Sequence, residues 1–387
     1  MENLQNHEQV TRQSYTDSVS YILAYSKQEQ QTQAEVLEWL ENSQEVTKKE
    51  SPEQHLGVVA FITNPAQTKV FLINHKKAGS YLMAGGHVDK GQNFQVTLQK
   101  ELKEELGLDI DCKEKQPFYV AKILTQGKNA GHNDITVAFR IVVPEDTIFQ
   151  LEQKEADSAR WFDWAELDSL PQFTQLSQIK EKLEVNKIVL VDNGGVLSDH
   201  YCEPWYGDLA NILEISKERL GELLSERSAH GIAYRKNLTT RNEFWDTVIK
   251  LSGTTKTLGY SVLEKLWAES YQLNQSVVNT LKQYQNVGIK TGNLMNTDRY
   301  RKEYIEQNYS PETFLDHTIT SCDTGFMKPD PEIFEEVMKV SQVKPENILY
   351  ADDRKSHADK SSEIGMTGIT YATLEEFKNR VIKFYQQ

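Results

Sequence analysis

The chain has 387 residues, 38% of them hydrophobic, so we expect two domains that each bury a core, and we exclude global disorder. Its 57 acidic and 43 basic residues give a formal net charge of −14, which disfavours a sequence-independent nucleic-acid binder. The three cysteines form no closely spaced pair, and the sequence shows neither a signal-peptide pattern nor an apolar run that could span a bilayer. We therefore expect a cytoplasmic protein without membrane or nucleic-acid partners.

The first half of the chain predicts a helical segment followed by a mixed α/β domain. Residues 1–55 are polar and carry apolar side chains at helical spacing, which indicates two helices. Strand-like runs begin near residues 56 and 69, a long amphipathic helix follows, and further strands are expected at 118–124, 135–142 and 159–164. We assign 1–55 to an N-terminal helical extension, 56–172 to the first domain and 173–186 to a linker helix.

The amphipathic helix, expected from about Gln92 to Leu106, carries three glutamates. Its apolar residues recur every four positions and mark a buried face, whereas Glu101, Glu104 and Glu105 are spaced i, i+3, i+4 and share another face. Such a cluster is either a solvated acidic stripe or a set of hard oxygen ligands for a divalent cation. A Gly-rich loop is expected directly before the helix, where the backbone could approach a metal or phosphate, and this favours the cation site.

These residues resemble the Nudix box, G-x5-E-x7-R-E-U-x-E-E-x-G-U, in which U is a bulky aliphatic residue. The matching positions are Gly86, Glu101, Leu102, Glu104, Glu105, Gly107 and Leu108. Two positions depart from the pattern: Gln92 replaces a glutamate and Lys100 replaces an arginine, so two polar anchors of the loop and helix are expected to be lost. The flanking strands agree with the family over about residues 10–170, which implies an α/β/α sandwich.

The resemblance implies hydrolysis of a nucleoside diphosphate linked to another group. By it, Glu101 and Glu105 are the main metal ligands with the Gly86 carbonyl, and Glu104 completes the set or acts as general base. Substrate contacts are expected from Gly85, Gly86 and His87. The nearby polar side chains of His87, Asp89, His132 and Asp134 are interpreted one by one as structural hydrogen-bonding groups rather than catalytic groups.

From residue 187 to 387 short strands alternate with helices, which predicts a doubly wound parallel sheet, with a helical cap at about 200–275. Two predicted strands end in acidic residues: Asp192 follows Ile188–Val191, and Asp352-Asp353 follow Ile348–Ala351. Carboxylates at strand ends lie where open α/β sheets bind ligands. Together with Lys328 they could form a phosphoryl-transfer site, although an acidic pair after a strand is more often a turn.

In this order the residues resemble the haloacid dehalogenase (HAD) superfamily over about residues 186–375. The resemblance implies that Asp192 is the nucleophile, that Lys328 balances charge and contacts substrate, and that the metal is bound by Asp192, Gly194, Asp352 and Asp353. Two positions depart from the family: Gly194 replaces an acid/base aspartate, and Met295 stands where a hydroxyl residue is expected. Asn296 or Thr297 could take over the contact with a phosphate oxygen.

Three interpretations remain open. The leading one is a two-domain enzyme, in which the HAD-like domain adds a phosphatase to the Nudix hydrolase. The second keeps an active Nudix domain beside a degenerate HAD-like module for ligand binding or dimerisation, and the third is a non-enzymatic metabolite sensor. In each case we expect Mg²⁺, with Mn²⁺ as the alternative cation, and a small phosphorylated metabolite or nucleoside-diphosphate substrate; homo-oligomerisation is left open.

Overall fold

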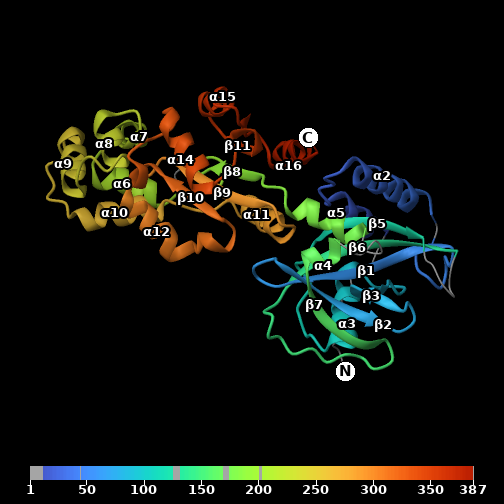
Figure 1. Ribbon diagram of the computed structural model, residues 1–387. Coiled ribbons are helices and arrows are strands. Elements are labelled where there is room, and N and C mark those ends of the chain that lie inside the picture. The colour runs from blue at the N-terminus through green and yellow to red at the C-terminus, as the bar shows by residue number, and fades with distance from the viewer. Residues whose placement is uncertain (1–11, 44, 125–130, 169–173, 200–202, 387) are drawn as a thin grey trace. The chain divides into compact units, whose positions relative to one another are not determined.

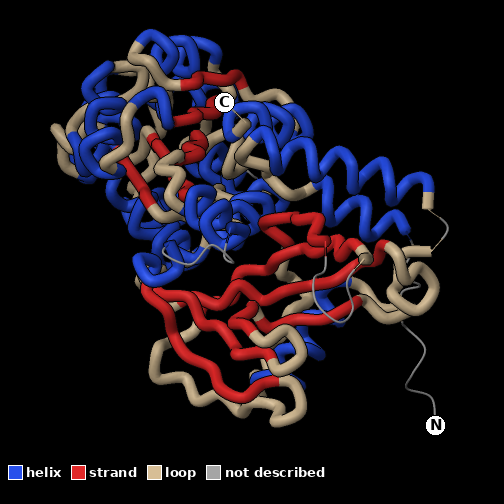
Figure 2. Tube along the Cα trace, turned by 45° about the vertical axis from the view of Figure 1, so that its right-hand side comes forward, coloured by secondary structure: helices blue, strands red, loops and turns tan. Residues whose placement is uncertain are grey.

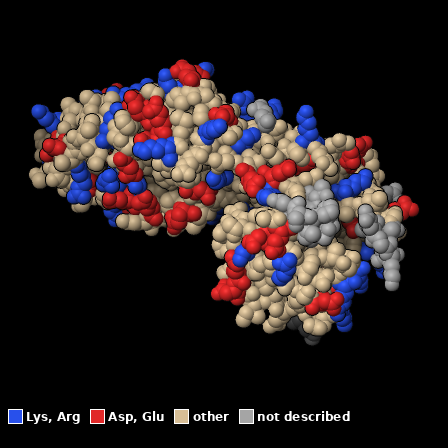
Figure 3. Space-filling model, in the orientation of Figure 1, with Lys and Arg blue, Asp and Glu red and all other residues tan. Residues whose placement is uncertain are grey.

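The structure, a computed structural model, describes residues 12–43, 45–124, 131–168, 174–199 and 203–386. The chain divides into two compact units: one comprises Met1–Val185, Asn286–Gly288 and Tyr385–Gln387, and the other Asn186–Gln285 and Ile289–Phe384 (Figure 1). Within the described ranges no helix has both the length and the apolarity to cross a membrane. On the face of each unit drawn in Figure 3, acidic and basic side chains are interspersed.

Two helices open the first unit, α1 (Arg12–Ser20) and α2 (Lys27–Asn42). The hydroxyl of Ser26 caps α2 by accepting a hydrogen bond from the N–H of Glu29, 3.1 Å away. Buried residues of both helices, such as Tyr15 and Val36, belong to the same hydrophobic core as the sheet. The two helices therefore pack as part of this unit's core.

The first unit is built on a seven-stranded sheet (Figure 2). Its strands in chain order are β1 (Gln54–Thr63), β2 (Lys69–His75), β3 (Ser80–Leu82), β4 (Ala84–His87), β5 (Pro117–Leu124), β6 (Asn133–Val142) and β7 (Ala156–Asp163). β1 and β6 are parallel over their whole length, and β4 is antiparallel to the middle of β1, with its last residue His87 opposite Gly57. The beginnings of β1 and β6 therefore meet the end of β4. Three helices complete the unit: α3 (Phe94–Leu106), α4 (Trp164–Asp168) and α5 (Thr174–Leu183).

The second unit contains a five-stranded parallel sheet of order β10-β9-β8-β11-β12. The strands are β8 (Ile188–Asp192), β9 (Lys290–Met295), β10 (His317–Thr320), β11 (Ile348–Asp352) and β12 (Thr367–Thr370). Every residue of the adjacent strands β8 and β11 is buried, as is typical of a parallel sheet covered on both faces. Because these strands run side by side, their carboxyl ends bring Asp192 and Asp352 to one edge.

Helices surround this sheet and also form a separate cap. The cap helices are α6 (Trp205–Ile212), α7 (Lys217–Leu224), α8 (Ala229–Arg235), α9 (Arg241–Ser252) and α10 (Tyr260–Glu269). They enclose their own apolar cluster around the fully buried Trp245. The other helices are α11 (Gln275–Asn286), α12 (Arg299–Tyr309), α13 (Ser321–Thr324), α14 (Pro331–Ser341), α15 (Lys355–Glu363) and α16 (Leu374–Tyr385), with the short 3-10 turns η2 (Pro311–Thr313) and η3 (Pro345–Asn347). The predicted two-domain α/β architecture is confirmed.

Two local expectations were wrong. Gly85 and Gly86, expected in a loop, lie in β4 and pair with β1. A Cβ atom at Gly85 would lie 2.1 Å from the carbonyl oxygen of Val58, so only glycine allows the two backbones to approach this closely. The helix with the three glutamates begins at Phe94 rather than near Gln92, because the side chain of Asn93 caps it.

Candidate active sites

Helix α3 is held in place by its two ends and its apolar face. The side chain of Asn93 accepts a hydrogen bond from the N–H of Val96 at 2.8 Å, and Gly107 ends the helix in the left-handed conformation with φ of 68°. The apolar face is buried as predicted, with exposed fractions of 0% at Leu98 and 1% at Leu102. This packing fixes the direction in which the glutamates project.

Two of the three glutamates face strand β4. The side chain of Glu105 is buried, and its Oε2 accepts a hydrogen bond from the N–H of Gly85 at 2.8 Å. Glu101 lies so close to the next glycine that a Cβ atom at Gly86 would be 2.6 Å from its carboxyl carbon. The structure therefore brings Glu101 and Glu105 together with the β4 glycines, whereas the side chain of Glu104 is exposed.

Burial raises the pKa of both inward-facing carboxyl groups. The pKa of Glu105 rises to about 7, since burial outweighs the hydrogen bond from Gly85. Burial also raises the pKa of Glu101, and the nearby charge of Lys100 only partly offsets it. One buried and one partly buried carboxylate, side by side at a bare glycine backbone, are costly to ionise unless a cation accompanies them. The residues of this site therefore fit a hard, oxygen-coordinated divalent cation such as Mg²⁺.

The two departures from the Nudix pattern keep polar contacts, contrary to the expected loss of both anchors. The side-chain oxygen of Gln92 accepts a hydrogen bond from the hydroxyl of Thr97 at 3.0 Å. Its carbonyl accepts another from the hydroxyl of Tyr15 in α1, at 2.6 Å. Lys100 forms an ion pair with Asp89 at 3.1 Å and so links the helix to the loop that precedes it. The loop and helix α3 are therefore linked through Gln92 and Lys100, although these residues differ from the Nudix pattern.

The second unit places four predicted residues at the carboxyl edge of its sheet. The ammonium group of Lys328 is buried, forms an ion pair with Asp192 and lies 3.3 Å from Oδ2 of Asp352. It also donates to the carbonyl of Leu294 at 2.7 Å. Carboxylate oxygens of Asp192, Asp352 and Asp353 all lie within 4.8 Å of one another, a spacing that one cation can bridge.

The pKa values of the two aspartates at the strand ends, Asp192 and Asp352, are shifted in opposite directions. Burial raises the pKa of Asp192 to about 6, although Lys328 works against it. Burial also acts to raise the pKa of Asp352, but the charge of Lys328 and the contact with His357 outweigh it, so the pKa is lowered. Burial lowers the pKa of the Lys328 ammonium, but the two carboxylates overcome this and the pKa is raised. Three carboxylates face one lysine, which leaves negative charge for a divalent cation to balance.

A cavity of about 150 Å³ opens beside these carboxylates. Residues at the carboxyl edge of the sheet line one side of it: Asp192, Gly194, Lys328 and Asp353. Cap residues, among them Arg235 and Trp267, line the other side. The cavity therefore lies between the carboxyl edge of the sheet and the cap, where a small phosphorylated ligand would be enclosed.

Met295 does not line this cavity, whereas the two residues that follow it do. Its side chain is buried in an apolar cluster with Tyr271 and Ile305. Asn296 and Thr297 line the cavity, and the amide group of Asn296 exchanges two hydrogen bonds with the backbone of Lys328, at 2.8 and 3.0 Å. The cavity is therefore lined by the amide of Asn296 and by Thr297 rather than by the thioether of Met295.

Three residues that contact this site, Tyr350, His357 and Glu226, were not predicted from the sequence. The hydroxyl of Tyr350 lies 2.9 Å from the nitrogen of Lys328 and donates to Asp352, and His357 Nδ1 lies 3.0 Å from the same carboxylate. Strand alternation could have indicated Tyr350, which is two residues from Asp352 in β11. Glu226, in the segment between α7 and α8, accepts a hydrogen bond from Asn296 at 3.0 Å. No local sequence pattern predicts this contact, because the two residues are far apart in the chain.

Comparison with known proteins agrees with this division. A NUDIX domain model matches residues 53–183, and a haloacid dehalogenase-like hydrolase model matches residues 186–358. Flavin mononucleotide hydrolase 1 of Arabidopsis thaliana is 36% identical over 67 residues, which cover 17% of this chain and 27% of that protein. Bifunctional epoxide hydrolase 2 of Rattus norvegicus is 27% identical over 81 residues, 21% of this chain and 15% of that protein. The chain thus spans about a quarter or less of the length of these relatives.

Solved structures of both kinds are similar to parts of the chain. A HAD family enzyme from Bacteroides thetaiotaomicron, in complex with magnesium and inorganic phosphate, is 21% identical with a TM-score of 0.44, and the match covers 50% of this chain and 98% of that one. A MutT protein from Methanosarcina mazei is 16% identical with a TM-score of 0.25, and covers 30% of this chain and 80% of that one. The two domain matches by themselves confirm the resemblances seen in the sequence: the chain contains a Nudix domain followed by a haloacid dehalogenase-like hydrolase domain.

Proposed function

We propose that the Nudix domain is a Mg²⁺-dependent hydrolase that cleaves the phosphoanhydride of a nucleoside-diphosphate-linked metabolite. The observation that carries the proposal is the convergence of Glu101 and Glu105 on the bare backbone of Gly85 and Gly86. Glu101, Glu105 and the Gly86 carbonyl hold the cation, and Mn²⁺ is the alternative ion. A bound cation of this kind screens the diphosphate and lowers the pKa of an attacking water.

Glu104 has a different role in this proposal. Its side chain points to solvent on the same helix, so it can take the proton of the attacking water or complete the cation's ligands once substrate is bound. The backbone of Gly85 and Gly86 and the side chain of His87 contact the substrate from β4.

A second activity is favoured by the buried contacts of Lys328. We propose that the HAD-like domain hydrolyses a phosphate monoester. A carboxylate oxygen of Asp192 attacks phosphorus, the bond to the alcohol oxygen breaks, and water then hydrolyses the aspartyl phosphate to release phosphate and free Asp192. Lys328 balances the charge, Asp352, Asp353 and the Gly194 backbone hold Mg²⁺, and Asn296 and Thr297 contact the phosphate oxygens.

Product analysis separates the two activities. The full chain with Mg²⁺ is incubated with nucleoside-diphosphate sugars, ADP-ribose, dinucleotides, sugar phosphates and flavin mononucleotide, the last because one relative is named for its hydrolysis. We expect Glu101→Gln to abolish phosphoanhydride cleavage alone and Asp192→Asn to abolish phosphate release from monoesters alone. The exposed residues Glu114 and Asp359 supply matched controls, Glu114→Gln and Asp359→Asn, which keep both activities.

Each alternative has its own outcome in this experiment. Phosphoanhydride cleavage without any effect of Asp192→Asn on phosphate release would identify the HAD-like domain as a ligand-binding or dimerising module. A wild-type chain that binds members of the panel but converts none of them would be a metabolite sensor. We further propose that the partners are small phosphorylated metabolites in the cytoplasm rather than nucleic acids, in keeping with the net charge of −14.

A further inference from the structure

A second cluster of chemically active side chains lies in the Nudix domain, apart from the glutamates of α3. It consists of His55, His87, His132 and Asp134, whose ring nitrogens and carboxylate oxygen all lie within 4.8 Å of one another. Asp134 is the register partner of His55 on the parallel strands β1 and β6, and His87 pairs with the residue two positions after His55. Because side chains alternate along strands, this register places His55, His87 and Asp134 on one face of the sheet.

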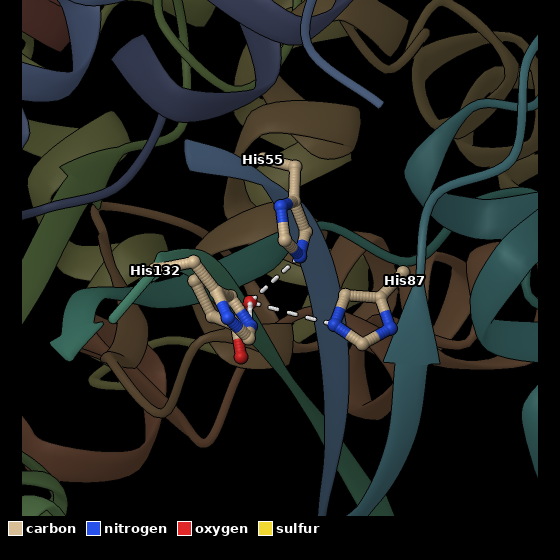
Figure 4. Close-up of side chains that lie close together, drawn as sticks. His55, His87 and His132 are labelled. Atoms are coloured by element: carbon tan, nitrogen blue, oxygen red, sulfur yellow. Dashed lines mark ion pairs between the residues drawn. The ribbon is translucent and has the colours of Figure 1, made fainter. Parts of the chain in front are cut away.

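The histidines converge on a single oxygen atom. Nε2 of His55 lies 2.9 Å from Oδ1 of Asp134, and Nε2 of His87 and of His132 each lie 3.4 Å from it. Figure 4 shows His55 and His87 pointing toward this oxygen from two sides, with His132 beside it. Zinc bonds of about 2.0–2.1 Å in a tetrahedral site place neighbouring ligand atoms about 3.3 Å apart. The two separations of 3.4 Å match that spacing, and the separation of 2.9 Å at His55 is shorter.

Hydrogen bonding does not account for the arrangement at His55. This side chain has an exposed fraction of 0%, and its Nδ1 lies 3.1 Å from the carbonyl oxygen of Ser51. A carbonyl only accepts hydrogen bonds, so Nδ1 carries the proton and Nε2 of the neutral ring presents a lone pair to Asp134. Accordingly, neither Nε2 of His55 nor Oδ1 of Asp134 has a hydrogen bond of acceptable geometry among the described residues.

The contact of His87 is consistent with the same conclusion. The ammonium group of Lys48 lies 3.4 Å from Nε2 of His87, and an ammonium group can only donate. When Lys48 donates, Nε2 of His87 accepts through its lone pair, and this same nitrogen lies 3.4 Å from Oδ1 of Asp134. Lys48 is exposed and carries a flexible side chain, so a cation can take its place. A nitrogen lone pair that faces a carboxylate oxygen at 2.9 Å, as between His55 and Asp134, is repelled by it, and a cation bound between the two atoms removes this repulsion.

We propose that His55, His87, His132 and Asp134 bind a Zn²⁺ ion. Three imidazoles and one carboxylate form a donor set that suits Zn²⁺ better than Mg²⁺, which prefers oxygen ligands alone. Four protein ligands fill a tetrahedral site, so the ion is structural and fastens the start of β1, the end of β4 and the start of β6. The site shares His87 with the proposed substrate contacts, but its four ligands are distinct from the carboxylates proposed to hold Mg²⁺.

Metal analysis of the full chain tests the proposal. The protein is stripped with a chelator, supplied with ZnCl₂, desalted and analysed by mass spectrometry for metal content. We expect about one zinc ion per chain in the wild type and its loss in His132→Asn and Asp134→Asn, which remove direct ligands and so weaken binding more than about 100-fold. His75→Asn, which changes a histidine of the same sheet paired with Glu155, keeps the ion.

Two further measurements make the result decisive. Co²⁺ bound in place of Zn²⁺ gives the visible absorption of a tetrahedral site in the wild type, a readout that needs no variant. Glu101→Gln and Asp192→Asn keep the zinc, which separates this site from the two proposed magnesium sites. A wild-type chain that retains no zinc after desalting overturns the proposal, as does full zinc content in both His132→Asn and Asp134→Asn.

Discussion

Replacing Glu105 with glutamine measures what the buried carboxylate costs the Nudix domain in the absence of metal. Burial raises the pKa of Glu105 from its ordinary 4.5 to about 7. A tenfold change in proton affinity corresponds to about 1.4 kcal/mol, so ionising this group in the folded, metal-free protein costs about 3 kcal/mol. Glutamine has nearly the same shape, stays neutral, and keeps an oxygen that can accept from the N–H of Gly85.

The sign of the pH dependence follows from the raised pKa. Below pH 4.5 the group is protonated in both the folded and the unfolded chain, and the cost is absent. Between pH 4.5 and about 7 the folded state binds more protons, so the free energy of unfolding falls as pH rises. We expect metal-free Glu105→Gln to be more stable than wild type by up to about 3 kcal/mol at pH 8 and nearly equal to it near pH 4.5.

Bound Mg²⁺ reverses the order of stability, so that the wild type becomes more stable than Glu105→Gln. A cation at 1,000 times its dissociation constant adds about 4.1 kcal/mol to the wild type, more than the cost of about 3 kcal/mol, and the variant gains little because it lacks a ligand. Differential scanning calorimetry of the full chain at pH 5 and pH 8, with chelator or with Mg²⁺, follows the transition of the first unit. Glu114→Gln is the matched control, because its exposed side chain carries no burial cost and lies outside the proposed site. Lower stability of metal-free Glu105→Gln at pH 8, or a difference that does not grow from pH 5 to pH 8, would refute the reasoning.

The remaining predictions concern packing and chemistry. The ammonium group of Lys182 lies 2.6 Å from the buried carboxylate of Glu29, and Lys182→Met leaves this carboxylate without its partner. The free energy of unfolding of the first unit, measured in urea, should therefore fall by about 3–5 kcal/mol. The double variant with Glu29→Gln should regain most of this loss. Gly86→Ala pushes a methyl group against Glu101 and should abolish Nudix activity while circular dichroism stays unchanged; an active variant would remove Gly86 from the site. Gly194 offers no acid for the leaving group, so aryl phosphates should react faster than alkyl phosphates. Gly194→Asp should speed alkyl phosphates by about 100-fold, and an equal effect on both classes in a phosphate-release assay would contradict this role.

Local patterns in the sequence determined much of this protein. Helical spacing predicted the buried face of α3, and short apolar runs ending in carboxylates predicted β8 and β11 with Asp192 and Asp352 at one edge. These features depend on the repeat of a single helix or strand and on the rule that parallel strands end at the same edge. Glu101, Glu105 and Lys328 were therefore identifiable as candidates before their neighbours were known.

Only the tertiary structure decided which of these side chains meet. It buries Glu105 and exposes Glu104, although both lie on the same helix, because the position of β4 determines which carboxylate loses its water. It also joins His55 to Asp134, which are 79 positions apart, through the register of two parallel strands. Pairing register and burial arise from contacts between distant segments, and no local period encodes them. The chemistry of each residue was thus set by the sequence, and its partners and protonation by the fold.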